Sequence, residues 1–100
     1  MRKIRMTTLD ALPPGAIVEK MILARRVAVV NDNGTVFGIQ SECAHMRASL
    51  AQGGVKDGVL TCNWHGWQYD LKTGECLTTP GVRLKQYPVE IENGTIYLVL

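Results

Sequence analysis

The chain has 100 residues, 46% of them hydrophobic and 20% charged, which is enough for one domain with one core. Its net charge of +2 is too small to indicate nucleic-acid binding, and no run of about eighteen apolar residues predicts a membrane-spanning helix. The basic start, Arg2, Lys3 and Arg5, precedes no apolar run, so we expect no signal peptide, and the odd count of three cysteines favours a cytoplasmic location.

The first forty residues predict a β-hairpin. Pro13-Pro14-Gly15 disfavours a helix, and residues 16–22 and 26–30 are rich in Val, Ile, Ala and Met, which is typical of strands. Residues 31–34 read N-D-N-G, a turn signal, because Asn and Gly tolerate positive φ. Residues 35–40 are then the returning strand, which leads to Cys43.

Two short cysteine–histidine motifs follow this hairpin. The first reads C-A-H at 43–45 and the second reads C-N-W-H at 62–65, and together they hold both histidines of the chain. Thiolate and imidazole ligands suit iron–sulfur, zinc or copper sites and argue against magnesium or calcium. The motifs therefore predict a metal site formed by Cys43, His45, Cys62 and His65.

The order of ligands within each motif separates the candidate metals. Zinc modules usually pair like ligands around one ion, as C-x₂₋₄-C and H-x₃₋₅-H. Here each motif is mixed, which a binuclear iron cluster explains if each loop gives its cysteine to one iron and its histidine to the other. A zinc-stabilised binding module without a redox role is the alternative.

The rest of the chain continues the β pattern. Residues 59–62 and 67–70 are expected strands between glycine-containing turns. Residues 84–91 and 96–100, joined by a turn at 92–95, are expected to form the last hairpin. Short strands at regular spacing predict an all-β sandwich or barrel-like domain.

The first motif has the pattern C-x-H at 43–45, and the second extends to C-x-x-H-G-W-x-Y-D at 62–70. With these two motifs the sequence resembles Rieske proteins, and small Rieske-type ferredoxins in particular. The resemblance implies a single Rieske domain over residues 1–100. Its antiparallel β-sandwich base would be about 1–42 and 82–100, with an inserted cluster-binding subdomain at about 43–81. It also implies one Rieske-type [2Fe–2S] cluster, with Cys43 and Cys62 on the inner iron and His45 and His65 on the outer iron.

Residues outside the ligand set distinguish the classes of Rieske protein. Respiratory Rieske subunits have an extra cysteine in each loop, which is missing here, so their disulfide cannot form. Cys76 is then a spare thiol, expected to be a buried, small hydrophobic residue. Oxygenase large subunits carry a 2-His-1-carboxylate iron site, and this chain has no histidines left to form one.

The resemblance therefore implies a soluble single-electron carrier that is not itself an enzyme and has no catalytic residues. Its expected partners are a ferredoxin reductase and a terminal oxygenase, such as an aromatic-ring dioxygenase, with no nucleic acid and no membrane. The alternative is the small Rieske subunit of an assimilatory nitrite reductase, whose partner would be the large subunit.

Side chains near the ligands are expected to set the reduction potential. High-potential Rieske proteins have a serine two residues after the second histidine, where this chain has Trp67, which cannot supply that hydroxyl. Their tyrosine, four residues after that histidine, bonds a cysteine sulfur, and Tyr69 occupies this position. We therefore expect a potential near the bottom of the Rieske range, at about −150 mV or slightly above. Gly66 is expected to allow backbone N–H donors to approach the cluster closely. Gly53-Gly54 is expected either to form the turn that folds the segment between the motifs over the cluster or to be an ordinary turn.

Overall fold

The computed structural model describes residues 2–43, 49–63 and 66–100, and their regular structure is almost entirely β, which confirms the expected all-β class. The elements are β1 (Lys3–Thr8), β2 (Ile17–Ile22), β3 (Arg25–Asp32), β4 (Thr35–Gln40), the 3₁₀ turn η1 (Leu50–Gln52), β5 (Gly54–Lys56), β6 (Val59–Thr61), β7 (Gln68–Asp70), β8 (Gln86–Tyr87), β9 (Val89–Glu92) and β10 (Thr95–Val99).

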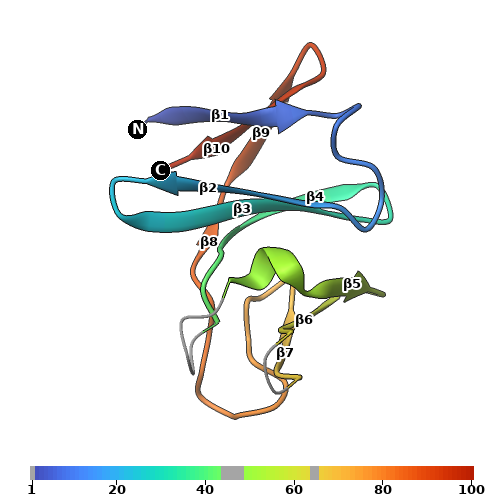
Figure 1. Cartoon of the computed structure of the whole chain (residues 1–100), viewed down its shortest axis with the longest axis vertical. Helices are drawn as coiled ribbons and strands as arrows, with labels where there is room; N and C mark the ends of the chain where they lie inside the picture. The colour runs from blue at the N-terminus through green and yellow to red at the C-terminus, as the bar shows by residue number, and fades with distance from the viewer. Residues whose placement is uncertain (1, 44–48, 64–65) are drawn as a thin grey trace.

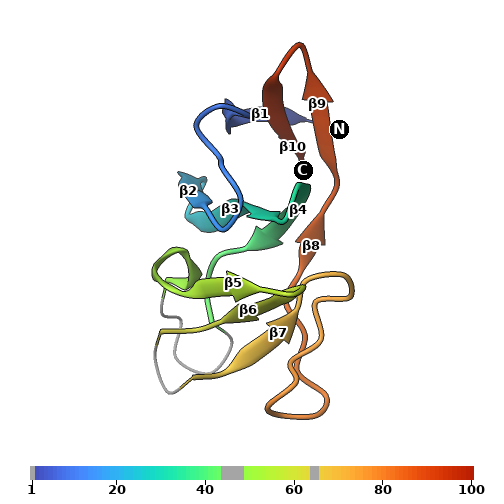
Figure 2. The same ribbon diagram turned by 90° about the vertical axis from the view of Figure 1, so that its right-hand side faces the viewer.

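These strands form three antiparallel sheets, with strand orders β1-β10-β9, β2-β3-β4-β8 and β5-β6-β7. In Figures 1 and 2 the β2-β3-β4 strands lie between the other two sheets, and β5-β6-β7 forms one end of the molecule. The two chain ends lie side by side, because β1 pairs with β10 and the backbones of Arg2 and Leu100 bond each other. The predicted division into a base and an insert at residues 43–81 stays a prediction.

Strand β3 separates two hydrophobic cores. Its residues from Val27 to Val30 are all fully buried, so the strand has no solvent-facing side. Successive side chains of a strand point to opposite faces, and here Val27 and Val29 join one core while Ala28 and Val30 join the other. The second core, which we call the thiol core, also contains all three cysteines. The central strand therefore connects the packing of the base directly to the predicted metal site.

The predicted strand at 84–91 is wrong as a single element. The structure divides it into β8, which pairs with β4, and β9, which pairs with β10 in a different sheet. Pro88 lies between the two and has no N–H to donate to a ladder. This change of sheet connects the β2-β3-β4-β8 sheet with the β1-β10-β9 sheet. Strand β1 was not predicted at all.

Four hairpins among the described residues close with two-residue turns in which both residues have positive φ. Three use the residues that such turns favour, Asn33-Gly34, Asp57-Gly58 and Asn93-Gly94. The fourth, between β2 and β3, uses Leu23-Ala24, with φ of 48° and 68°. Leu23 is also 78% exposed, so this turn combines backbone strain with an exposed apolar side chain.

No helix in the described part of the chain is long and apolar enough to cross a membrane.

Replacing the strained turn should stabilise the protein. The double variant Leu23→Asn/Ala24→Gly should gain about 1 kcal/mol, because glycine avoids the cost of about 1 kcal/mol that a Cβ brings in the left-handed region, and Asn tolerates that region better than Leu. For a domain of this size the apparent melting temperature should rise by about 4–8 °C, measured by circular dichroism. The reciprocal control, Asn93→Leu/Gly94→Ala, should lower it. An unchanged or lower melting temperature in the first variant would show that the turn is not strained.

Candidate metal centre

The two predicted thiolate ligands meet in the thiol core. Cys43 follows the end of β4, and Cys62 follows β6, so they come from two different sheets. Their exposures are 0% and 1%, and both belong to one buried cluster of side chains. The structure therefore brings together the two cysteines that the sequence predicted as ligands. The two predicted imidazole ligands, His45 and His65, lie outside the described residues.

Each cysteine stands at the base of a loop whose two sides are held together. In the second loop the N–H of Cys62 donates to the carbonyl of Trp67 over 2.7 Å, which extends the β6–β7 ladder. In the first loop the N–H of Leu50 donates to the carbonyl of Ser41 over 3.0 Å, and an antiparallel bridge joins Glu42 to Ser49. Each cysteine–histidine motif of the sequence thus falls in a loop whose two ends are bonded to each other, and each loop contains one predicted histidine ligand in its sequence.

Tyr69 contacts the sulfur of the first cysteine. Its ring is fully buried on β7, and its hydroxyl oxygen lies 3.1 Å from Cys43 Sγ. A thiolate accepts hydrogen bonds only, so the tyrosine O–H is the donor whenever Cys43 is deprotonated. This contact confirms the expectation that Tyr69 bonds a cysteine sulfur. Trp67, which stands where high-potential proteins have serine, packs partly buried against the thiol core.

The third cysteine is buried nearby but has a different environment. Cys76 is 7% exposed, and its sulfur accepts a hydrogen bond from the N–H of Thr79 over 3.3 Å. Its backbone pairs with Tyr69 in an isolated bridge. None of the three cysteines forms a disulfide. These contacts confirm that Cys76 is a buried side chain of the core.

One of the glycines between the motifs is required by close packing. A Cβ on Gly53 would lie 2.0 Å from the carbonyl oxygen of Thr61, the residue before Cys62. Gly53 therefore lets the end of η1 lie against the backbone that leads into the second loop. Gly54 has open space around its Cβ position, which is consistent with an ordinary surface glycine. Gly66 has φ of +69°, a conformation that also favours glycine.

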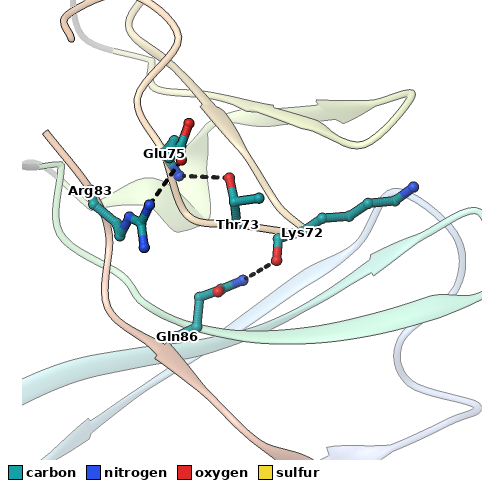
Figure 3. Close-up of polar contacts among 5 residues, drawn as sticks. All are labelled: Lys72, Thr73, Glu75, Arg83 and Gln86. Atoms are coloured by element: carbon teal, nitrogen blue, oxygen red, sulfur yellow. Dashed lines mark hydrogen bonds and ion pairs between the residues drawn. The ribbon is translucent and has the colours of Figure 1, made fainter. Parts of the chain in front are cut away.

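Side-chain contacts fasten the segment after β7 to Arg83 and Gln86 (Figure 3). The amide of Gln86, on β8, donates to the carbonyl of Leu71 over 2.7 Å. It also donates to the carbonyl of Lys72 over 3.1 Å, as Figure 3 shows. Arg83 bonds Glu75 over 2.8 Å. Gly74 is needed between them, because its φ is +81° and a Cβ would lie 2.5 Å from the carbonyl of Leu84. These contacts position Cys76 and the following loop beside the thiol core.

The described residues fit an iron–sulfur group better than an unligated pair of thiols. Two buried cysteines emerge from closed loops, and a buried hydroxyl is directed at one of the sulfurs. A buried thiolate is costly without a positive partner, and metal ions supply that partner. The donor set of thiolates and imidazoles matches the ligands of a histidine-containing binuclear cluster.

Comparisons with known proteins agree with this chemistry. The family model for the Rieske [2Fe–2S] domain matches residues 3–88. The biphenyl dioxygenase ferredoxin subunit of Pseudomonas sp. (strain KKS102) is 36% identical over 87 residues, which cover 85% of this chain and 80% of that protein.

Solved structures have the same fold. A chain in the complex of reduced oxygenase and oxidized ferredoxin in carbazole 1,9a-dioxygenase superposes with a TM-score of 0.88 at 26% identity, covering 96% of this chain and 91% of that one. A putative nitrite reductase NADPH small subunit superposes over 100% of both chains with a TM-score of 0.80, but at 24% identity this likeness shows the fold alone. By its sequence, its fold and its buried cysteine pair, the chain belongs to the Rieske [2Fe–2S] domain family.

Proposed function

We propose that this protein is a cytoplasmic single-electron carrier that passes electrons from a ferredoxin reductase to a terminal oxygenase of the aromatic-ring dioxygenase type. The observation that supports this most is the pair of buried cysteines, Cys43 and Cys62, each in a closed loop that also contains a histidine. The 36% identity to a dioxygenase ferredoxin subunit favours this partner class over nitrite reductase, for which the likeness is one of fold.

In this proposal four side chains hold one [2Fe–2S] cluster. Cys43 and Cys62 bind one iron, and His45 and His65 bind the other, the ligation typical of Rieske centres. The bound cluster supplies reversible one-electron chemistry and forms no bond to a substrate. No residue of the chain is assigned a catalytic role.

The surrounding residues control the conditions for electron transfer. Burial of both cysteines excludes water from the sulfur ligands, which strengthens every local electrostatic interaction. The hydroxyl of Tyr69 donates to the Cys43 sulfur and favours the more negative, reduced state, which raises the potential. Trp67 supplies no hydroxyl, so we propose that the reduction potential of the cluster is low within the Rieske range.

The first test is the identity of the metal. The purified protein should be red-brown and hold about two irons and two acid-labile sulfides per chain. Reduced protein should give the EPR signal of low average g value that histidine-ligated centres show. Zinc in place of iron, in protein produced with adequate iron, would instead support the binding-module alternative.

The second test separates the cysteines by role. Cys62→Ser should lose the cluster, because a hydroxyl is a poor ligand where iron requires thiolate. Cys76→Ser should keep the full iron content and the same potential, because the Cys76 sulfur accepts a hydrogen bond from the Thr79 N–H and is not one of the predicted ligands. Iron analysis of the two variants decides this. Loss of iron from the Cys76 variant would overturn the ligand assignment.

The third test measures the tyrosine contact. Tyr69→Phe removes the hydroxyl 3.1 Å from Cys43 Sγ and should lower the midpoint potential by some tens of millivolts, where about 59 mV is a tenfold change for one electron. Protein-film voltammetry gives this value. Tyr97→Phe, on β10 of the base, is the matched control and should leave the potential unchanged. Equal potentials for Tyr69→Phe and wild type would show that the bond has no influence on the cluster.

A further inference from the structure

A carboxylate from the base sheet fastens both ends of the first ligand loop. Ser41 precedes this loop, and Ser49 follows its undescribed part. Ser41 Oγ donates to Glu19 Oε1 over 2.6 Å, and Ser49 Oγ donates to the same oxygen over 2.8 Å. One oxygen atom of Glu19 therefore joins the two residues between which Cys43 and His45 lie.

The position of Glu19 on its strand explains how it reaches the loop. In β2 the alternate residues face opposite cores: Ile17 packs against the thiol core, and Val18 packs against the other core. Glu19, two residues after Ile17, lies on the face of the thiol core and is half-buried. An acidic residue at an inward-facing strand position is costly unless its oxygens accept hydrogen bonds, and here two hydroxyls donate to it.

Both serines are themselves held in place by further bonds. Ser41 is fully buried, its N–H donates to the carbonyl of Arg26 over 2.9 Å, and its carbonyl accepts from Leu50. Ser49 caps η1, because its hydroxyl oxygen accepts from the N–H of Ala51 over 3.3 Å while its O–H donates to Glu19. Glu19 thus links β2, the end of β4 and the start of η1 through one hydrogen-bonded group.

We propose that Glu19 is a positioning residue for the cluster: with Ser41 and Ser49 it fixes the two ends of the loop that contains Cys43 and His45 in the sequence. Bonds from hydroxyls to a charged carboxylate are the strong class of hydrogen bond. Glu19 touches no predicted ligand and acts through the two serines. The inference rests on the proposed function only because it requires that the protein hold a cluster.

The experiment measures how firmly the loop holds iron. Purified wild-type protein and its variants are mixed with a strong iron chelator, and loss of the visible cluster absorption is followed with time. Glu19→Ala should release iron about tenfold faster or more, since the carboxylate acceptor is lost by both serines. Glu19→Gln keeps an oxygen acceptor at the same place and should stay within about threefold of the wild-type rate. Glu90→Ala, an exposed carboxylate of β9, is the matched control and should match wild type.

Two further measurements separate positioning from general stability. Ser49→Ala is a smaller change that should also speed release several-fold. The Glu19→Ala/Ser49→Ala double variant should release iron less fast than the two single effects combined predict, because both substitutions remove the same Ser49–Glu19 bond. The EPR g values of the reduced cluster should shift or broaden in Glu19→Ala and Ser49→Ala but not in Glu90→Ala. A change in fold stability alone would leave them unchanged.

The inference would be overturned if Glu19→Ala and Ser49→Ala released iron at the wild-type rate and gave the wild-type EPR spectrum. A Glu19→Gln variant that loses iron as fast as Glu19→Ala would also overturn it, because the acceptor oxygen would then not be the group that matters. The outcome is distinct from failure of the proposed function, in which the wild-type protein itself would contain no iron.

Discussion

The burial of two thiols in one core is the constraint on which the rest of the structure depends. Cys43 and Cys62 arrive from different sheets, and both are almost completely removed from solvent. A thiolate in this environment has lost its hydration and needs positive charge and hydrogen-bond donors in its place. Iron would supply the charge, and the hydroxyl of Tyr69 supplies one donor. The backbone hydrogen bonds that join the two ends of each loop keep these groups together.

The base contributes more than a support for the loops. Strand β3 is buried on both faces, so Val27 and Val29 pack into one core while Ala28 and Val30 pack into the thiol core. The carboxylate of Glu19 makes a second link, this time polar, between β2 and the two ends of the first loop. Packing changes in the base can therefore reach the predicted ligands through apolar contact and through hydrogen bonds.

The parts of the fold predicted from sequence are those with strong local signals. The turn at Asn93-Gly94 and the hydrophobic run of β3 were predicted from local sequence, and the structure agrees. Leu23-Ala24 was missed because neither residue favours positive φ, and the turn forms only because β2 and β3 pair on either side of it. The pairing of β1 with β10 joins residues almost a whole chain apart, which no local pattern indicates.

The candidate site shows the same division. Its cysteines followed from motif spacing, and the tyrosine partner followed from the resemblance to Rieske proteins. Glu19 followed from neither, because a single glutamate in a strand has no signature until its neighbours in space are known. The position of Pro88 could have signalled the break between β8 and β9, since proline interrupts a ladder.

The central claim is that two histidines share one cluster with two cysteines. The chain has only two histidines, so protein labelled with ¹⁵N-histidine carries the label at two residues, His45 and His65. Electron–nuclear double resonance on the reduced, labelled protein should show two strongly coupled ¹⁵N nuclei, one each from His45 and His65. Mössbauer spectra of the oxidised protein should show two inequivalent irons. A spectrum without strong ¹⁵N coupling, together with two equivalent irons, would mean that thiolates alone bind the metal and would contradict the account.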